Sequence, residues 1–160
     1  MYKRQVLDGG LKKWLIENRK VTSEKTILKN SIYRATENKN LVKSILEINE
    51  NIGQKKFTII DARSKERFNG SVPDPRKNVK SGSIPNSVCL PFKEIINSSD
   101  NTFKGLSEIS KKFSEIIDLN DDNTVFSCGS GITACVLGLA YSLVNNTYSP
   151  TVYDLSLIHI

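Results

Sequence analysis

The sequence predicts an α/β protein with an open, mostly parallel sheet and helices on both faces. Short apolar runs, typical of buried parallel strands, alternate along the chain with segments of helical periodicity. The clearest strands are a run that ends in an acid, 57–61, and a run that leads into a cysteine, 124–127. Helices that connect parallel strands cover the faces of the sheet. Ligands of such sheets bind beyond the carboxyl ends of the strands.

The elements expected in the first half of the chain are short. A helix is expected to begin near Leu11, and residues 20–37 are polar and aperiodic, as a linker would be. Apolar positions over 41–48 predict a short amphipathic helix. One or two helical turns at 64–68 follow the strand at 57–61, and a long irregular stretch comes next. A self-contained unit therefore starts only after the linker.

The second half alternates in the same way. A short strand is expected at 88–90, with a small helix through Ile96 behind it. Apolar residues over 106–117 define the clearest surface helix, and the polar run 120–123 predicts a turn. A last strand is expected around 151–153.

Composition limits the function classes. A chain of 160 residues holds one good core, and its net charge of +6 comes from lysines interleaved with acids. Without a basic cluster interleaved with aromatics, this charge indicates a solvated surface rather than a nucleic-acid face, although it would attract a small anionic substrate. Residues 1–5 lack the apolar core of a secretory signal, and the longest apolar stretch, 134–141, is too short to span a membrane. We therefore expect a cytoplasmic protein with no membrane partner.

The cysteine pattern excludes two scaffolds. Cys89, Cys128 and Cys135 form an odd set without a CxxC pair, and the single histidine, His159, lies at the extreme end. A disulfide framework and a zinc site are both disfavoured, and we expect a reducing compartment and no metal or organic cofactor. Cys89 and Cys135 are expected to be core residues, because free cysteine is commonly buried.

Cys128 occupies a different setting. It follows the apolar run 124–127 and precedes a segment with helical periodicity. The apolar positions of that segment are Ile132, Cys135, Val136, Leu139 and Leu143. Backbone N–H groups at a helix N-terminus point toward whatever lies there and stabilise a thiolate. Gly129 and Gly131 allow a close backbone approach that a packing cysteine would not require, so Cys128 is predicted to be a catalytic nucleophile.

Two chemistries use a thiolate in such a loop. Phosphatases with a Cys-x5-Arg loop need the arginine to grip a phosphoryl group, and Ala134 stands at that position. Sulfur transfer remains, in which the thiolate accepts sulfur from a donor and carries it as a persulfide. Amide donors alone satisfy a persulfide anion. The residues expected to supply them are Gly129, Ser130, Gly131, Ile132 and Thr133.

The segment 128–134 resembles the active-site loop of the rhodanese superfamily, specifically its two-domain 3-mercaptopyruvate and thiosulfate sulfurtransferases. Further segments resemble the family's strand-and-arginine region, its second strand and its last strand. They are Asp61–Ser64, Arg67–Gly70, Pro73–Arg76, Gly82–Pro85, Leu90–Phe92 and Tyr153–Asp154. The resemblance implies that Cys128 takes sulfur from 3-mercaptopyruvate, a small anionic donor, and passes it to a thiol, thioredoxin or cyanide.

The resemblance also assigns roles around Cys128. Thiosulfate-specific members carry basic residues where this chain has Gly129 and Ser130, which favours 3-mercaptopyruvate. Arg67 and Arg76 would bind the substrate carboxylate, and Ser130 would hydrogen-bond the substrate or help in proton transfer. Arg63 is expected to be a structural partner of a nearby acid, Asp61. Two alternatives stay open, a thiosulfate:cyanide sulfurtransferase and a non-catalytic rhodanese-like binding module.

The same resemblance divides the chain. Residues 1–19 resemble the end of a preceding, non-catalytic rhodanese domain, and 20–37 would be the interdomain linker. Residues 38–154 are expected to form the catalytic domain, and 155–160 a non-native tail. The missing first domain is thus an expected partner in the intact protein.

Overall fold

Three parallel strands form the sheet at the centre of the protein. The computed structural model describes residues 5–27, 29, 30, 32, 34–75 and 81–154. The strands are β1 (Thr58–Asp61), β2 (Val88–Cys89) and β3 (Thr124–Ser127), in the order β2-β1-β3. Asp61 pairs with Cys89 on one side and with Ser127 on the other, so all three strands end at one edge. The predicted parallel sheet is confirmed.

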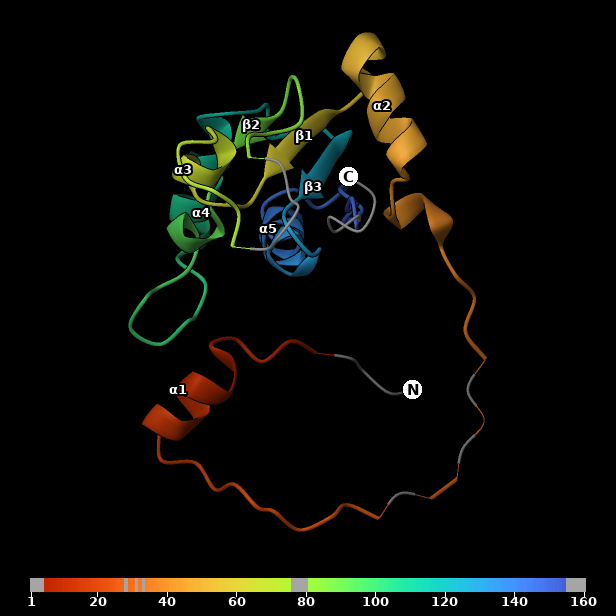
Figure 1. Ribbon diagram of the computed structural model, residues 1–160. Coiled ribbons are helices and arrows are strands. Elements are labelled where there is room, and N and C mark those ends of the chain that lie inside the picture. The colour runs from red at the N-terminus through yellow and green to blue at the C-terminus, as the bar shows by residue number, and fades with distance from the viewer. Residues whose placement is uncertain (1–4, 28, 31, 33, 76–80, 155–160) are drawn as a thin grey trace.

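Helices cover both faces of this sheet (Figure 1). They are α2 (Ile45–Gln54), α3 (Lys65–Phe68), α4 (Leu106–Ser114) and α5 (Ile132–Ser142), with 3-10 turns η1 (Lys39–Leu41) and η2 (Phe92–Glu94). Ile60 and Phe126 join a core cluster with α4 and α5. Ile59 and Val125, on the opposite side of the strands, pack with α2. Alternate strand residues thus face different helical layers, as the pleat requires.

An aromatic cluster fixes α5 against β3. Phe113, Phe126, Tyr141 and Tyr148 have neighbouring ring centroids between 4.8 and 6.1 Å apart. The Tyr148 hydroxyl donates to the carbonyl of Thr124 at 2.9 Å, and burial raises the pKa of Tyr148 to about 12. The loop between β3 and α5 is therefore anchored at both ends.

The face of α5 that packs on the sheet is opposite to the predicted one. Its buried residues are Ala134, Leu137, Gly138, Ala140 and Tyr141, whereas Ile132, Cys135 and Leu143 are exposed. The prediction was wrong because α5 is apolar almost all round, so that periodicity does not choose a face. The face that packs carries Tyr141, whose ring lies 6.0 Å from that of Phe126, and Gly138, where a Cβ would be in van der Waals contact with Phe126.

Several element boundaries also differ from the prediction. Helix α2 begins at Ile45 rather than at residue 41, because Ser44 and Glu47 form a reciprocal capping box. Helix α4 ends at Ser114. The last strand is reduced to isolated bridges from Val152 to Phe126 and Val42.

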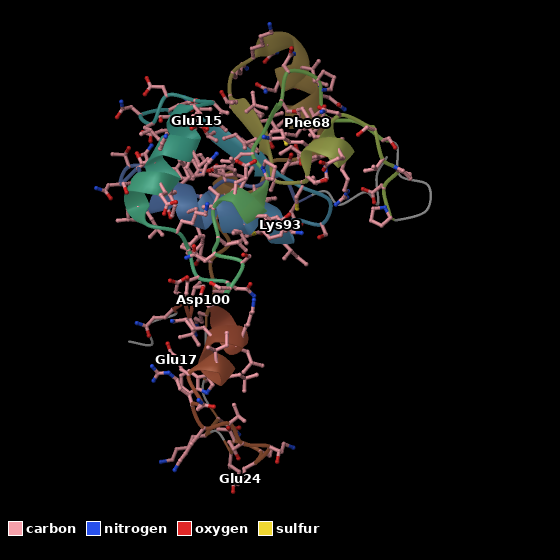
Figure 2. All side chains as sticks on the ribbon, turned by 90° about the vertical axis from the view of Figure 1, so that its left-hand side faces the viewer. Glu17, Glu24, Phe68, Lys93, Asp100 and Glu115 are labelled. Carbon is pink, nitrogen blue, oxygen red and sulfur yellow. The ribbon has the colours of Figure 1, made fainter. Side chains whose placement is uncertain are left out.

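The N-terminal helix α1 (Gly10–Ile16) touches the domain through polar contacts. The Asp8 carboxylate accepts from the Phe103 amide at 2.8 Å, and Lys12 Nζ donates to the carbonyl of Ser98, also at 2.8 Å. Figure 2 shows Asp100 where the domain meets this helix, with Glu17 and Glu24 farther away. The described residues of 20–37 lie in no helix or strand and are exposed. Within the described part of the chain, no helix is long and apolar enough to cross a membrane.

Candidate active site

Cys128 lies at the carboxyl edge of the sheet, where the sequence predicts a ligand site. It follows the completely buried strand β3 and stands four residues before α5. Its side chain is half-buried, and its Sγ accepts a hydrogen bond from the Ser130 amide at 3.4 Å. The sulfur therefore accepts a hydrogen bond from a backbone amide of the loop that leads into α5.

Gly131 shapes the loop around the sulfur. It has a left-handed backbone with φ of 77°, and a Cβ there would come within 2.4 Å of an Asp154 carboxylate oxygen. Gly129 is buried and Thr133 half-buried, whereas Ser130 and Ile132 are exposed. The residues predicted to surround a persulfide thus lie together, with the Ser130 and Ile132 positions open to solvent.

Arg63 and Asp61 form a buried ion pair at the same edge. The Asp61 carboxylate accepts from Arg63 Nε and Nη2 at 2.6 to 3.0 Å, and Nη2 also donates to the carbonyl of Gly82 at 2.7 Å. Burial alone would lower the pKa of Arg63, but hydrogen bonds and charge from Asp61, with a smaller effect from Asp74, raise it. The structural role predicted for Arg63 is confirmed.

Arg67 belongs to α3, which directly follows β1 and so lies at the edge that carries Cys128. Its Nη2 donates to Asp74 Oδ2 in a further ion pair. Ser64 precedes this helical turn in an extended conformation, and Asn69 ends it. Arg76, the second predicted carboxylate ligand, lies outside the described residues.

The other two cysteines have different environments. Cys89 is half-buried in β2, and burial raises its pKa to about 11. Cys135 is exposed, so its prediction as a core residue is wrong, for the reason given for α5. Although the residue as a whole is exposed, its sulfur is partly withdrawn from water. This partial burial, together with the nearby Cys128 and Asp154, raises the pKa of Cys135. All three thiols are free.

A large cavity lies elsewhere. It has a volume of about 590 Å³ and is lined by α2 and by residues around the starts of β1 and β3, including Phe57, Asn123 and Thr124. This is the edge of the sheet opposite to Cys128. Among the described residues, no group of three or more His, Cys, Asp or Glu side chains is placed to hold a metal ion.

Comparison with known proteins agrees with this geometry. The family described as "Rhodanese-like domain" matches residues 44–156. The chain belongs to the rhodanese-like family. It is 35% identical to the mouse 3-mercaptopyruvate sulfurtransferase and 35% identical to the chicken thiosulfate sulfurtransferase, covering 93% of this chain and 50% of each relative. The rhodanese-like chain therefore spans about half the length of these curated relatives.

Solved structures agree on the fold. SseA from Escherichia coli, described among the 3-mercaptopyruvate sulfotransferases, superposes with a TM-score of 0.72 at 24% identity. The match covers 89% of this chain and 52% of that chain. At this identity the likeness supports the rhodanese fold alone.

Two acids of this rhodanese-like domain were not predicted to have a role. Asp74 pairs with Arg67, and Asp154 lies against Gly131. An acid between two prolines, seven residues after an arginine, was the available signal for Asp74. Asp154 had no local signal, because its neighbour is 23 residues away along the chain.

Proposed function

We propose that this rhodanese-like domain is the catalytic part of a sulfurtransferase in which Cys128 carries sulfur from 3-mercaptopyruvate to a thiol or cyanide. The observation that carries the proposal is the position of Cys128 Sγ, which is half-buried before α5 and within 3.4 Å of a backbone donor. Relatives named for 3-mercaptopyruvate and for thiosulfate sulfur transfer support the reaction class.

The first half-reaction transfers a sulfur atom. The Cys128 thiolate attacks the sulfur of 3-mercaptopyruvate, a sulfur–sulfur bond forms, and the carbon–sulfur bond breaks. Its electron pair passes to the enolate of pyruvate, which takes up the proton of the donor thiol. The products are pyruvate and a Cys128 persulfide anion, whose terminal sulfur the loop amides would hold. Ser130, exposed beside the sulfur, would hydrogen-bond the donor or relay that proton.

The second half-reaction restores the enzyme. A thiol attacks the outer sulfur and leaves as a persulfide, or cyanide attacks it and leaves as thiocyanate, and Cys128 returns to its thiolate. In the first half-reaction Arg67 would bind the carboxylate of the donor and then that of the pyruvate product, and Arg76 is proposed as its companion. The cytoplasmic compartment and the additional first domain remain predictions.

Mass spectrometry of the intact protein tests the proposal. After incubation with 3-mercaptopyruvate, we expect a gain of about 32 Da, one sulfur atom, located on Cys128 by peptide mapping. Cys128→Ser should abolish the gain, and the matched variant Cys135→Ser should keep it. No gain on the unsubstituted protein would favour the non-catalytic binding module.

The donor is tested separately. Neither Gly129 nor Ser130 offers a cation to a dianionic donor, so we propose that 3-mercaptopyruvate loads Cys128 faster than thiosulfate does. Relatives named for thiosulfate make the opposite preference the rival. Single-turnover loading rates with each donor decide between them, and faster loading by thiosulfate would contradict the proposed donor.

A further inference from the structure

Asp74 is a buried carboxylate that faces the guanidinium of Arg67. Only 2% of the Asp74 side chain is exposed, whereas 26% of the Arg67 side chain is exposed. A carboxylate withdrawn from water needs a counter-charge and hydrogen-bond donors, and Arg67 Nη2 supplies both. The acid is therefore the more buried member of the pair, and the arginine the more exposed one.

The local fold brings this acid back onto α3. Gly70, with a left-handed φ of 74°, reverses the chain immediately after the helix. Ser71 then donates to the carbonyl of Glu66 through its amide at 3.0 Å and its hydroxyl at 3.1 Å. A proline on each side of Asp74 restricts the backbone that carries the carboxylate. Asp74 is thus presented from a stiff segment that is bonded to the helix of Arg67.

The rest of the Arg67 side chain has little freedom. Its Nε is buried and has no acceptor among the residues that the structure describes. A buried donor without a partner is costly, so the side chain would not adopt this arrangement unless other contacts held it. Among the residues that the structure describes, the ion pair with Asp74 is a contact that holds it.

We propose that Asp74 is a positioning residue that holds the Arg67 guanidinium ready for the carboxylate of the sulfur donor. An arginine whose orientation is already restricted loses less freedom when it binds a ligand, so its affinity is higher. Since Arg67 is the carboxylate ligand of the proposed function, this inference rests on that function. The competing hypothesis is that Asp74 lowers the affinity for the donor, because its carboxylate competes with the donor carboxylate for the Arg67 guanidinium.

Equilibrium binding distinguishes positioning from competition. In the Cys128→Ser background, which prevents sulfur transfer, calorimetry measures the Kd of 3-mercaptopyruvate. We expect Arg67→Ala and Asp74→Asn each to raise Kd about tenfold, since bound charge pairs act as a unit. In a chain that already carries Arg67→Ala, Asp74→Asn should have no further effect, because Asp74 acts through Arg67. The matched control is Glu47→Gln. It removes an acid of α2 that is paired with Lys43, and it should leave Kd unchanged.

Each outcome has a distinct meaning. If 3-mercaptopyruvate does not bind, or if Arg67→Ala leaves Kd unchanged, the proposed role of Arg67 fails and this inference fails with it. If Arg67→Ala weakens binding but Asp74→Asn leaves it unchanged or tightens it, only the positioning role of Asp74 is overturned. A second measurement needs no Asp74 variant. Side-chain ¹H–¹⁵N spectra of the Cys128→Ser protein report on rotation of the arginine guanidinium groups. The Arg67 signal is assigned by its loss in Arg67→Lys. Slow rotation at Arg67 is expected, and free rotation would overturn the inference.

Discussion

The left-handed backbone of Gly131 makes the loop before α5 sensitive to a single methyl group. At a φ of 77°, an alanine would carry the ordinary cost of a left-handed residue, about 1–2 kcal/mol. Its Cβ would also meet an Asp154 carboxylate oxygen at 2.4 Å. Asp154 is exposed, so its carboxylate can swing away, and the backbone cost should dominate. We therefore expect Gly131→Ala to destabilise the protein by about 1–2 kcal/mol, or about 2–8 °C in Tm.

Thermal unfolding followed by circular dichroism measures this effect against a matched control. Gly53 lies within α2, where an added Cβ would have no neighbour within 4 Å. Gly53→Ala should therefore stabilise the protein by up to about 1 kcal/mol, because alanine loses less backbone entropy in a helix. The same methyl group is expected to have opposite effects at the two glycines.

The double variant Gly131→Ala, Asp154→Ala separates the two costs. If the backbone dominates, removing the Asp154 carboxylate recovers only a small part of the lost stability. Full recovery would mean that the collision, and not φ, controls the loop. An unchanged Tm for Gly131→Ala alone would refute the left-handed requirement altogether.

Three further predictions concern the groups around the site and the opposite layer. Only 10% of the Arg63 side chain is exposed, and Asp61→Asn removes the carboxylate that pairs with it. Urea unfolding should therefore show that the free energy of unfolding falls by about 3–5 kcal/mol. A decrease below about 1 kcal/mol would contradict a buried pair. Hydrogen bonds from Lys43 and Ser44 lower the pKa of Glu47 to about 2, so its contribution to stability is present above its usual pKa of 4.5 and is lost as the pH falls through about 2. The stability difference between the unsubstituted protein and Glu47→Gln should shrink over that window, and a constant difference would show that the carboxylate charge is irrelevant. Because burial raises the pKa of Cys89 to about 11 from 9.0, iodoacetamide at pH 7 should modify it about 100-fold more slowly than free cysteine; quantitative peptide mapping checks this, and modification at the free-cysteine rate would argue against a buried thiol.

Patterns of neighbouring residues predicted much of the fold and of the candidate site. A strand, a glycine-flanked cysteine and a helix follow one another within 124–142, so the setting of Cys128 is readable from adjacent residues. The Asp61–Arg63 pair spans two residues and is equally local. The capping box that begins α2 is also local, because Ser44 and Glu47 stand three residues apart, and it fixes the start of α2 where apolar periodicity does not.

Other features depend on contacts that periodicity does not encode. Cys135 is exposed because α5 packs on the sheet through the opposite face, which carries Leu137, Gly138 and Tyr141. The N-terminal segment reaches the domain through hydrogen bonds between residues that are 86 and 95 positions apart. Pairings over such distances require the whole chain to be folded, because loop closure brings the partners together only then.

From the sequence alone, a thiol can be placed after a buried parallel strand and before a helix, because neighbouring residues set backbone conformation and helix polarity. The folded structure is needed to show which groups farther apart along the chain meet. Arg67 lies against Asp74 because the chain reverses at Gly70 and returns along α3, and Gly131 lies against Asp154 because residue 154 comes back to the loop before α5. Charge pairing and close approach act through space, and the fold sets those distances.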